Sequence, residues 1–165
     1  MWEGRFIVAR RRGRWEYVSR ARGIRAAVIL AVDKGDVLLV EQYRVPLGRA
    51  CLELPAGLVG DEDDADEDSL AAAARELEEE TGYRAGRIEA VGEFHSSPGM
   101  VSESFTLVKA GALEQVGAGG GEGDENIIVH RVPIATIAAF VAAKRAEGVA
   151  IDVKLLLLLG GSLLD

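Results

Sequence analysis

The sequence has a single cysteine, a deficit of basic residues and no long apolar run. Cys51 cannot form a disulfide within the chain, which is typical of proteins in a reducing cytoplasm. The longest purely apolar run covers residues 26–32 and is too short to cross a bilayer. Residues 1–14 are rich in arginine and lack the apolar core of a secretory signal. We therefore expect a cytoplasmic protein that does not interact with membranes.

Acidic residues outnumber basic ones, with 27 aspartates and glutamates against 19 lysines and arginines, and the formal net charge is −8. A surface this acidic repels nucleic-acid backbones, so we expect no nucleic-acid partner. A small phosphate substrate is compatible with this charge, because bound divalent cations can reverse it locally. The 165 residues, 48% of them hydrophobic, can bury one core, and their number fits one domain with a small terminal extension.

The order of apolar and periodic segments predicts an α+β fold with a mixed sheet. Strands are predicted at residues 5–9, 15–19, 26–32, 37–42, 52–54, 88–94, 104–110 and 126–131. Helices are predicted at residues 69–81, 134–147 and 153–164. A basic turn at residues 10–14 joins the first two strands, and loops are predicted at residues 57–64 and 96–100. Residues 117–125 are rich in glycine and predict a mobile segment.

The segment Ser69–Thr81 gives the strongest helix signal, because it is dense in alanine, leucine, glutamate and arginine. Gly82 then favours a left-handed cap. Glu76, Glu79 and Glu80 are spaced i, i+3, i+4, so they share one face of this helix and repel one another. Divalent cations would neutralise such a face, and magnesium prefers carboxylate oxygens. A solvated acidic face on a surface helix is the alternative interpretation.

The full pattern is longer than the three glutamates. Glu67 is followed after seven residues by Arg-Glu-Leu-Glu-Glu-Glu-Thr-Gly-Tyr at positions 75–83. From Glu67 onward this segment resembles the Nudix box. The glycine that opens such a box is most naturally Gly57, which lies nine intervening residues before Glu67 instead of five. We interpret the difference as an acidic insertion of about four residues in a surface loop, where insertions cost little.

The resemblance implies a Nudix fold, in which a mixed β-sheet is sandwiched between helices (α/β/α). We expect this domain at residues 26–165, preceded by a small antiparallel β-hairpin at residues 1–25 that is swapped between the subunits of a homodimer. The resemblance also implies two or three Mg²⁺ ions, which Mn²⁺ can replace. Their expected ligands are Glu76, Glu80, Glu79, the Ala56 carbonyl and Glu125. Arg75, Glu67, Gly57 and Gly82 are expected to support the box.

Residues outside the box resemble the branch that cleaves ADP-ribose and other nucleoside diphosphate sugars. Residues 41–44 look like its Gln-aromatic-Arg strand end, which implies that Arg44 meets the substrate phosphates. Residues 97–103 look like its Ser-Pro-Gly loop, which implies contacts to the ribose. The implied substrate-binding residues are Arg44, Pro98, Gly99, Met100 and Glu103, with Trp15 or Tyr17 stacked on the base. A surface arginine, an ordinary turn and core aromatics are the structural alternatives.

Residues 122–130 resemble the acidic loop that supplies a late metal ligand or base in this branch. Glu125 is the first candidate for the catalytic base, followed by Glu122 and Glu79. The expected reaction is magnesium-dependent hydrolysis of ADP-ribose to AMP and ribose 5-phosphate, with GDP-mannose or another nucleotide sugar as the alternative substrate. A non-catalytic Nudix-fold nucleotide-binding module and an acidic interaction protein are the alternatives from other functional classes.

Overall fold

A computed structural model describes residues 2–21, 24–60, 68–123 and 125–164. Its helices are α1 (Ser69–Thr81), α2 (Ile137–Ala146) and α3 (Leu156–Leu164). Its strands are β1 (Ile7–Arg12), β2 (Trp15–Arg20), β3 (Arg25–Asp33), β4 (Asp36–Arg44), β5 (Arg49–Glu53), β6 (Ala56–Val59), β7 (Tyr83–His95), β8 (Ser104–Gln115), β9 (Ile128–Pro133) and β10 (Ala150–Ile151). Short 3-10 turns, η1 (Val45–Leu47), η2 (Ile134–Thr136) and η3 (Val153–Leu155), complete the elements.

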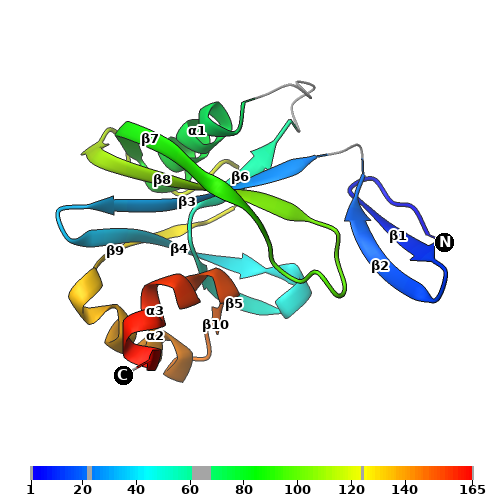
Figure 1. The fold of residues 1–165 in the computed structure, drawn as a ribbon. Helices are drawn as coiled ribbons and strands as arrows, with labels where there is room; N and C mark the ends of the chain where they lie inside the picture. Colours follow the sequence, from blue (N-terminus) through cyan, green and yellow to red (C-terminus); the bar gives the residue numbers. More distant parts are fainter. Residues whose placement is uncertain (1, 22–23, 61–67, 124, 165) are drawn as a thin grey trace.

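The main sheet is mixed and lies between helices on both of its faces. Its strands follow the order β10-β5-β4-β3-β8-β7, with β6 added on β3 and β9 added on β4. The pairs β3–β8 and β10–β5 are parallel, and the other pairs are antiparallel. Figure 1 shows α1 on one face and α2 with α3 on the other. This arrangement confirms the predicted α/β/α architecture.

Alternation along β3 explains how one sheet supports two cores. Ala27, Ile29 and Ala31 point to the side of α1, where they join Leu77 of the helix in one buried cluster. Val28 points the other way and joins a second cluster with residues of α2 and η3. Because both faces are covered, β3 is apolar along most of its length, which is the reason that the sequence shows a continuous apolar run there.

Strands β3 and β4 pair only next to their connecting turn and then diverge. Their registered pairs are Val32 with Val37 and Asp33 with Asp36. Beyond that point β3 takes β6 as its neighbour and β4 takes β5. The divergence separates the start of β3 from the end of β4 at Arg44, and the candidate site lies between these two strand ends.

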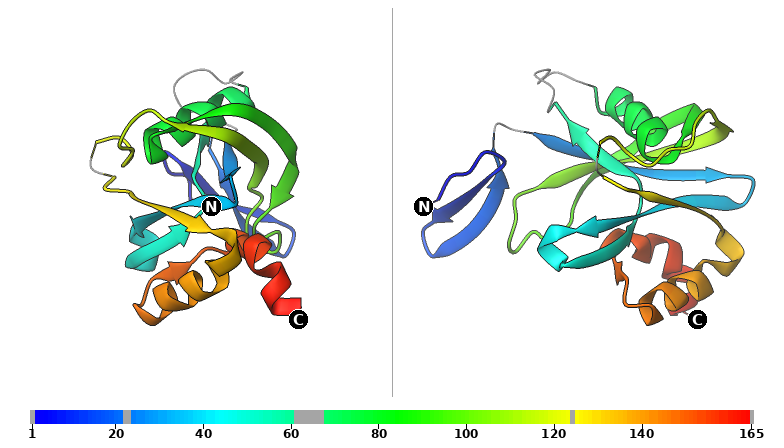
Figure 2. Two further views of the ribbon diagram at one scale, coloured as in Figure 1. Left: turned by 90° about the vertical axis from the view of Figure 1, so that its left-hand side faces the viewer. Right: turned by 180° about the vertical axis from the view of Figure 1, so that it is seen from behind.

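The hairpin β1–β2 forms its own two-stranded sheet beside the main body (Figures 1 and 2). The structure corrects the predicted basic turn at residues 10–14, because residues 10–12 belong to β1 and the turn consists of Gly13 and Arg14. Gly13 has a φ of 61°, which allows this tight two-residue connection. The hairpin contacts the main body through Val18, whose backbone bonds to Met100 and Ser102.

Other boundaries also differ from the sequence predictions. Residues 56–59, predicted in part as a loop, form β6 because they pair with the free edge of β3. The short strand β10 was not predicted, and the second helix opens with the 3-10 turn η2. Glu67 and most of the acidic insertion lie outside the described residues. Of the helices in the described part of the chain, none is long and apolar enough to cross a membrane.

A largely buried charge cluster ties α2 to the sheet. The Glu41 carboxylate of β4 accepts hydrogen bonds at 2.9 Å from Lys144 Nζ of α2 and lies 2.9 Å from His130 Nε2 of β9. Burial alone would raise the pKa of Glu41, but the hydrogen bonds from Lys144 and His130 outweigh it and lower that pKa. Removal of Glu41 would leave the largely buried Lys144 with only its longer contact of 3.4 Å to the exposed Glu147.

We predict that Glu41→Gln lowers the free energy of unfolding by about 3 kcal/mol near neutral pH, measured by urea denaturation. Because the pKa of Glu41 is lowered in the folded state, its stabilisation is present above the ordinary value of 4.5 and is lost as the pH falls through the lowered pKa. The deficit of the variant should therefore narrow in acid. Glu78→Gln, which breaks an exposed ion pair with Arg84, is the control and should change stability little. An equal loss in both variants would contradict this account.

Candidate functional site

The divergent ends of β3 and β4 border a cavity of about 410 Å³. Five carboxylates, two of them on α1, and three cationic side chains line its wall. The carboxylates are those of Glu53, Glu76, Glu80, Glu103 and Glu125, and the cations are Arg20, Arg44 and Lys154. A hollow with both signs of charge is suited to a ligand that combines phosphates with hydroxyl groups.

Glu76 lies directly against the backbone of Gly57. A Cβ atom at position 57 would lie 1.9 Å from Glu76 Cδ and 2.1 Å from Glu76 Oε1. Any larger residue at position 57 would therefore displace the Glu76 side chain, although the φ of Gly57 is not positive and does not itself require glycine. The strand β6 brings Gly57 to this position by pairing Gly57 with Ala27 of β3. The glycine of the box thus fixes how closely the helix carboxylate approaches the sheet.

Glu80 is the most deeply buried glutamate of the helix. Its Oε2 accepts a hydrogen bond of 3.0 Å from the Ala56 backbone N–H. Burial, and to a smaller extent the nearby carboxylates of Glu76 and Glu125, raise the pKa of Glu80 to about 8 against the opposing hydrogen bond from the Ala56 N–H. Glu80 therefore carries a proton at neutral pH in the absence of a neutralising cation.

Arg75 forms ion pairs with two glutamates of α1. Its Nη1 donates to Glu76 Oε1 and to Glu79 Oε2, each at 3.0 Å. The second contact spans one turn of α1, so the helix itself sets its geometry. These are the ion pairs that the resemblance implies for Arg75, and they hold Glu76 in the orientation in which it meets Gly57.

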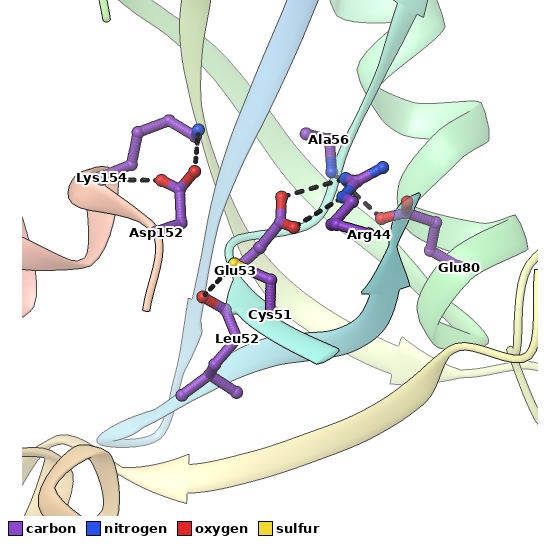
Figure 3. Close-up of polar contacts among 8 residues, drawn as sticks. All are labelled: Arg44, Cys51, Leu52, Glu53, Ala56, Glu80, Asp152 and Lys154. Atoms are coloured by element: carbon purple, nitrogen blue, oxygen red, sulfur yellow. Dashed lines mark hydrogen bonds and ion pairs between the residues drawn. The ribbon is translucent and has the colours of Figure 1, made fainter. Parts of the chain in front are cut away.

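Arg44 ends β4 inside the cavity and forms a two-pronged ion pair with Glu53 of β5. Its Nε and Nη2 donate to the two carboxylate oxygens at 2.7 and 3.0 Å, as Figure 3 shows. This pairing raises the pKa of Arg44, and the nearby charge of Glu80 contributes in the same direction. Glu53 is buried, so its carboxylate holds the plane of the guanidinium in one orientation. The third nitrogen, Nη1, is not part of that pair.

The glycine-rich segment is bonded to the C-terminal end of α1. The Glu80 carbonyl accepts from Gly120 N at 2.9 Å, the Glu79 carbonyl from Gly121 N at 3.1 Å, and the Gly82 carbonyl from Gly117 N at 3.0 Å. The segment thereby satisfies carbonyls that a helix end leaves without partners. The sequence predicts a mobile segment here, whereas the structure anchors its first part to the helix.

The same anchoring explains two glycines and the position of Glu125. Gly82 caps α1 with a φ of 74°, and a Cβ there would meet the Gly117 carbonyl oxygen at 2.4 Å. A Cβ at Gly119 would meet the Thr81 carbonyl carbon at 2.4 Å. After this close contact the chain turns back and Glu125 reaches the cavity, where its Oε2 also accepts from the Glu122 backbone N–H at 3.0 Å.

The structure brings together only part of the predicted set. Ala56, Gly57, Glu76, Glu80, Glu125, Arg44 and Glu103 line the cavity. Glu79 and Glu122 do not line it. Trp15, Pro98 and Gly99 line a separate hollow between the hairpin and residues 97–102, and Met100 lies in a second hollow on the hairpin. Glu103 itself is paired with Arg20 of β2 at 2.6 Å.

Sequence reasoning assigned no role at the site to Glu53 and Lys154. Glu53 was noted only as part of the strand that enters the box, and no local signal showed that β5 would place it beside Arg44. Lys154 lies in the predicted third helix, far along the chain, and reaches the cavity because β10 pairs with β5. Cys51 is free and buried, and burial raises the pKa of its thiol to about 12, so it does not ionise near neutral pH.

The chemistry of the site fits a divalent cation. Glu76 and Glu125 are close enough to Glu80 to raise its pKa, and carboxylate oxygens are the ligands that magnesium prefers. In the described residues, no three acidic, histidine or cysteine side chains are already grouped in a ligating arrangement. Arg75 and the Ala56 N–H hold these carboxylates in the absence of a cation. A bound cation would neutralise the negative charge of these carboxylates.

Comparison with known families decides the classification. The family model described as the NUDIX domain matches residues 21–148, well over half of the chain. The chain belongs to the Nudix family. The segment that resembles the Nudix box, from Gly57 through α1 to Gly82, lies within the matched residues.

Curated relatives of this Nudix protein have several names. It is 34% identical over 120 residues to a methanol dehydrogenase activator of Bacillus methanolicus, covering 72% of this chain and 63% of the relative. It is 40% identical over 77 residues to an ADP-ribose pyrophosphatase of Bacillus subtilis strain 168, covering 47% and 40%. It is 35% identical over 148 residues to a GDP-mannose pyrophosphatase of Cronobacter sakazakii, covering 84% and 72%. The matches to the first relatives span 40% to 63% of their lengths.

A solved structure has the same fold. The crystal structure of an ADP compounds hydrolase superposes with a TM-score of 0.67, covering 95% of this chain and 91% of the other at 20% identity. This agreement supports the Nudix fold over nearly the whole chain.

We predict that Gly57→Ala displaces Glu76 and weakens magnesium binding by at least about tenfold, because an added methyl group cannot fit where it would lie 1.9 Å from Glu76 Cδ. Calorimetric titration with magnesium measures the effect. Gly161→Ala is the matched control, because no heavy atom lies within 4 Å of a Cβ built at that position in α3. Unchanged binding by a folded Gly57→Ala variant would refute the close-approach argument.

A second prediction concerns pH and Glu80 in the metal-free protein. Because its folded pKa is raised from 4.5 to about 8, the stability contributed by the neutral acid is complete below 4.5 and is lost as the pH rises through 8. In EDTA, the free energy of unfolding should fall on the order of 2 kcal/mol between about pH 6 and about pH 9. Glu80→Gln should remove most of this fall, whereas Glu89→Gln, on an exposed part of β7, should retain it. A fall that persists in Glu80→Gln would assign the effect to another group.

Proposed function

We propose that this protein hydrolyses the pyrophosphate bond of a nucleoside diphosphate sugar in the presence of magnesium, with ADP-ribose as the first candidate and AMP and ribose 5-phosphate as products. The observation that carries the proposal is the cavity that joins the buried box glutamates to the Arg44–Glu53 pair. The relatives named ADP-ribose, ADP-sugar and GDP-mannose pyrophosphatases support the same chemistry. The whole protein's activity remains a proposal because most of these matches cover only part of each relative.

The metal ligands in this proposal are Glu76, Glu80, the Ala56 carbonyl and Glu125, with Glu79 close by. Bound magnesium ions, two or three in number, would neutralise the pyrophosphate and lower the pKa of an attacking water. Manganese is a chemically reasonable substitute. Glu76 and Glu80 are preorganised for this task, because Gly57, Arg75 and the Ala56 N–H hold them in place before any ligand arrives.

Glu125 is the strongest candidate for the general base. It lines the cavity with Glu76 and Glu80, whereas Glu122 does not line it and Glu79 is paired with Arg75. The backbone anchoring of residues 117–121 positions the start of its loop. A carboxylate at this place can accept the proton of a water molecule that attacks phosphorus.

Arg44 is proposed to bind the phosphates and Glu103 the sugar hydroxyls. The Nη1 of Arg44 is the nitrogen outside its two-pronged pair with Glu53, so it can donate to a phosphate oxygen. Trp15, Pro98, Gly99 and Met100 line hollows beside the hairpin. The resemblance implies a role toward the base for Trp15 and toward the ribose for Pro98, Gly99 and Met100. The hairpin at residues 1–25 is proposed to be swapped between the two subunits of a homodimer. A cytoplasmic location fits the single, buried Cys51.

GDP-mannose or another nucleotide sugar is the alternative substrate within this class. The match to the GDP-mannose pyrophosphatase covers more of the chain than the match to the ADP-ribose enzyme, and the glycine-rich stretch fits either group. A non-catalytic nucleotide-binding module is disfavoured, because the box retains Arg75, Glu76, Glu79 and Glu80 together.

We predict that Glu80→Gln lowers kcat for ADP-ribose by at least about a hundredfold while the fold stays intact, because it removes a charged ligand at the reacting bond. Glu125→Gln should have a similar effect if Glu125 is the base, and Glu122→Gln should have a small one. Release of the matching nucleoside monophosphate (AMP, GMP or UMP) from ADP-ribose, GDP-mannose, UDP-glucose and diadenosine polyphosphates, each with magnesium and with EDTA, identifies the substrate. Near-normal turnover by folded Glu80→Gln would reject the metal assignment, and hydrolysis of none of these compounds would favour the binding module.

A further inference from the structure

The cavity has an end that faces away from the helix glutamates and is formed by Lys154. In Figure 3 the Arg44–Glu53 pair lies between Glu80 on one side and the Asp152–Lys154 pair on the other. Lys154 lines the same cavity as Glu80 and Arg44, so one ligand of the size of a nucleotide sugar can contact both ends. The box and the metal chemistry leave this lysine without a role.

Lys154 is held in a fixed position before any ligand binds. Asp152 Oδ1 accepts from the Lys154 backbone N–H and Asp152 Oδ2 accepts from Lys154 Nζ, each at 2.7 Å. Asp152 is itself fixed, since its N–H donates to the Leu52 carbonyl at 3.0 Å next to the β10–β5 pairing. The side chains of both residues are only 19% exposed. Such a partly buried ammonium group keeps its place at low entropic cost when a ligand binds.

The charge balance at this end favours neutral oxygen groups over another phosphate. Asp152 neutralises Lys154, and a phosphate placed beside Nζ would also lie close to the Asp152 carboxylate. An ammonium group has three hydrogens, and Asp152 accepts a hydrogen bond from one of them. The hydrogens that remain can donate to hydroxyl oxygens without adding net charge.

An apolar ring lies beside these donors. Lys154 Nζ is 5.8 Å from the centre of the Phe105 ring, and Phe105 lines the same cavity. Across this end, Glu103 paired with Arg20 offers both a hydrogen-bond acceptor and a donor. An aromatic face, a fixed donor and a mixed ion pair together match a sugar ring, which has C–H faces and hydroxyl edges.

We propose that Lys154 is a specificity-determining residue that donates hydrogen bonds to the hydroxyls of the sugar moiety, with Asp152 as its positioning residue. This inference rests on the proposed function, because it names the part of the cavity that takes the sugar half of the substrate. Arg44 and the box glutamates contact the pyrophosphate, whereas Lys154 distinguishes a sugar ester from a simple ester of the same nucleotide.

The test compares ADP-ribose with the ethyl ester of ADP, in which an ethyl group on the terminal phosphate replaces the ribose. The loss of one or two hydrogen bonds in Lys154→Met should lower kcat/KM for ADP-ribose about five- to tenfold, mainly through KM. The kcat/KM for the ethyl ester should stay within about twofold of wild type, since that compound has no sugar hydroxyls on the terminal phosphate, which is the half assigned to Lys154. Lys34→Met, at an exposed turn, is the matched control and should leave kcat/KM for both substrates unchanged.

Each outcome separates the inference from the proposed function. Wild-type protein that hydrolyses neither compound would overturn the proposed function itself. Active wild type with an unchanged preference in Lys154→Met would overturn the role of Lys154. An equal loss on both substrates would also overturn it, because it would place Lys154 at the pyrophosphate. If Lys154→Met fails to fold, Lys154→Gln provides the test, because it keeps a donor and should lose the sugar preference only in part.

Discussion

The structure of the site depends on the contact between the Glu76 carboxylate and the backbone of Gly57. No side chain can stand between them, so α1 packs closely enough to the β6 edge for a second helix glutamate, Glu80, to be buried against the Ala56 N–H. Water cannot fully solvate the Glu80 carboxylate in this position. Its ionised form is therefore disfavoured, and the pKa of Glu80 is raised. A bound divalent cation, as proposed, would relieve this condition by neutralising the carboxylates.

Two further features of the fold turn this charged contact into a site. The divergence of β3 and β4 opens the cavity and places Arg44 at its border, where Glu53 fixes the guanidinium plane. The glycine-rich segment closes the other side, since its N–H groups satisfy the last carbonyls of α1 and bring Glu125 beside Glu76 and Glu80. The mixed sheet therefore places the Arg44 guanidinium at the cavity, and the end of α1 with the glycine-rich segment places the acidic groups there.

How far the sequence predicted this arrangement depended on whether a signal was local. Helix α1 was predicted with the bounds that the structure has, because its propensities, the i, i+4 glutamates and the Gly82 cap all lie within a few residues. The resemblance to the Nudix box and the α/β/α fold was confirmed by the family match and the fold comparison. Strand β6 was predicted as a loop because its pairing partner is β3, some 30 positions earlier. Glu53 and Lys154 were missed for the same physical reason. They reach the cavity through the pairing of strands that are distant in the sequence, and a local sequence pattern does not show such pairing.

The central claim is that these buried glutamates hold a cation and that Glu80 must lose a proton for this to happen. Calorimetric titration of magnesium at about pH 7, in buffers of different ionisation enthalpy, counts the protons released on binding. With a pKa of about 8 for Glu80 in the metal-free protein, the account predicts saturable binding and the release of close to one proton for each protein molecule. Saturable binding with no proton release, or no saturable binding at all, would contradict it.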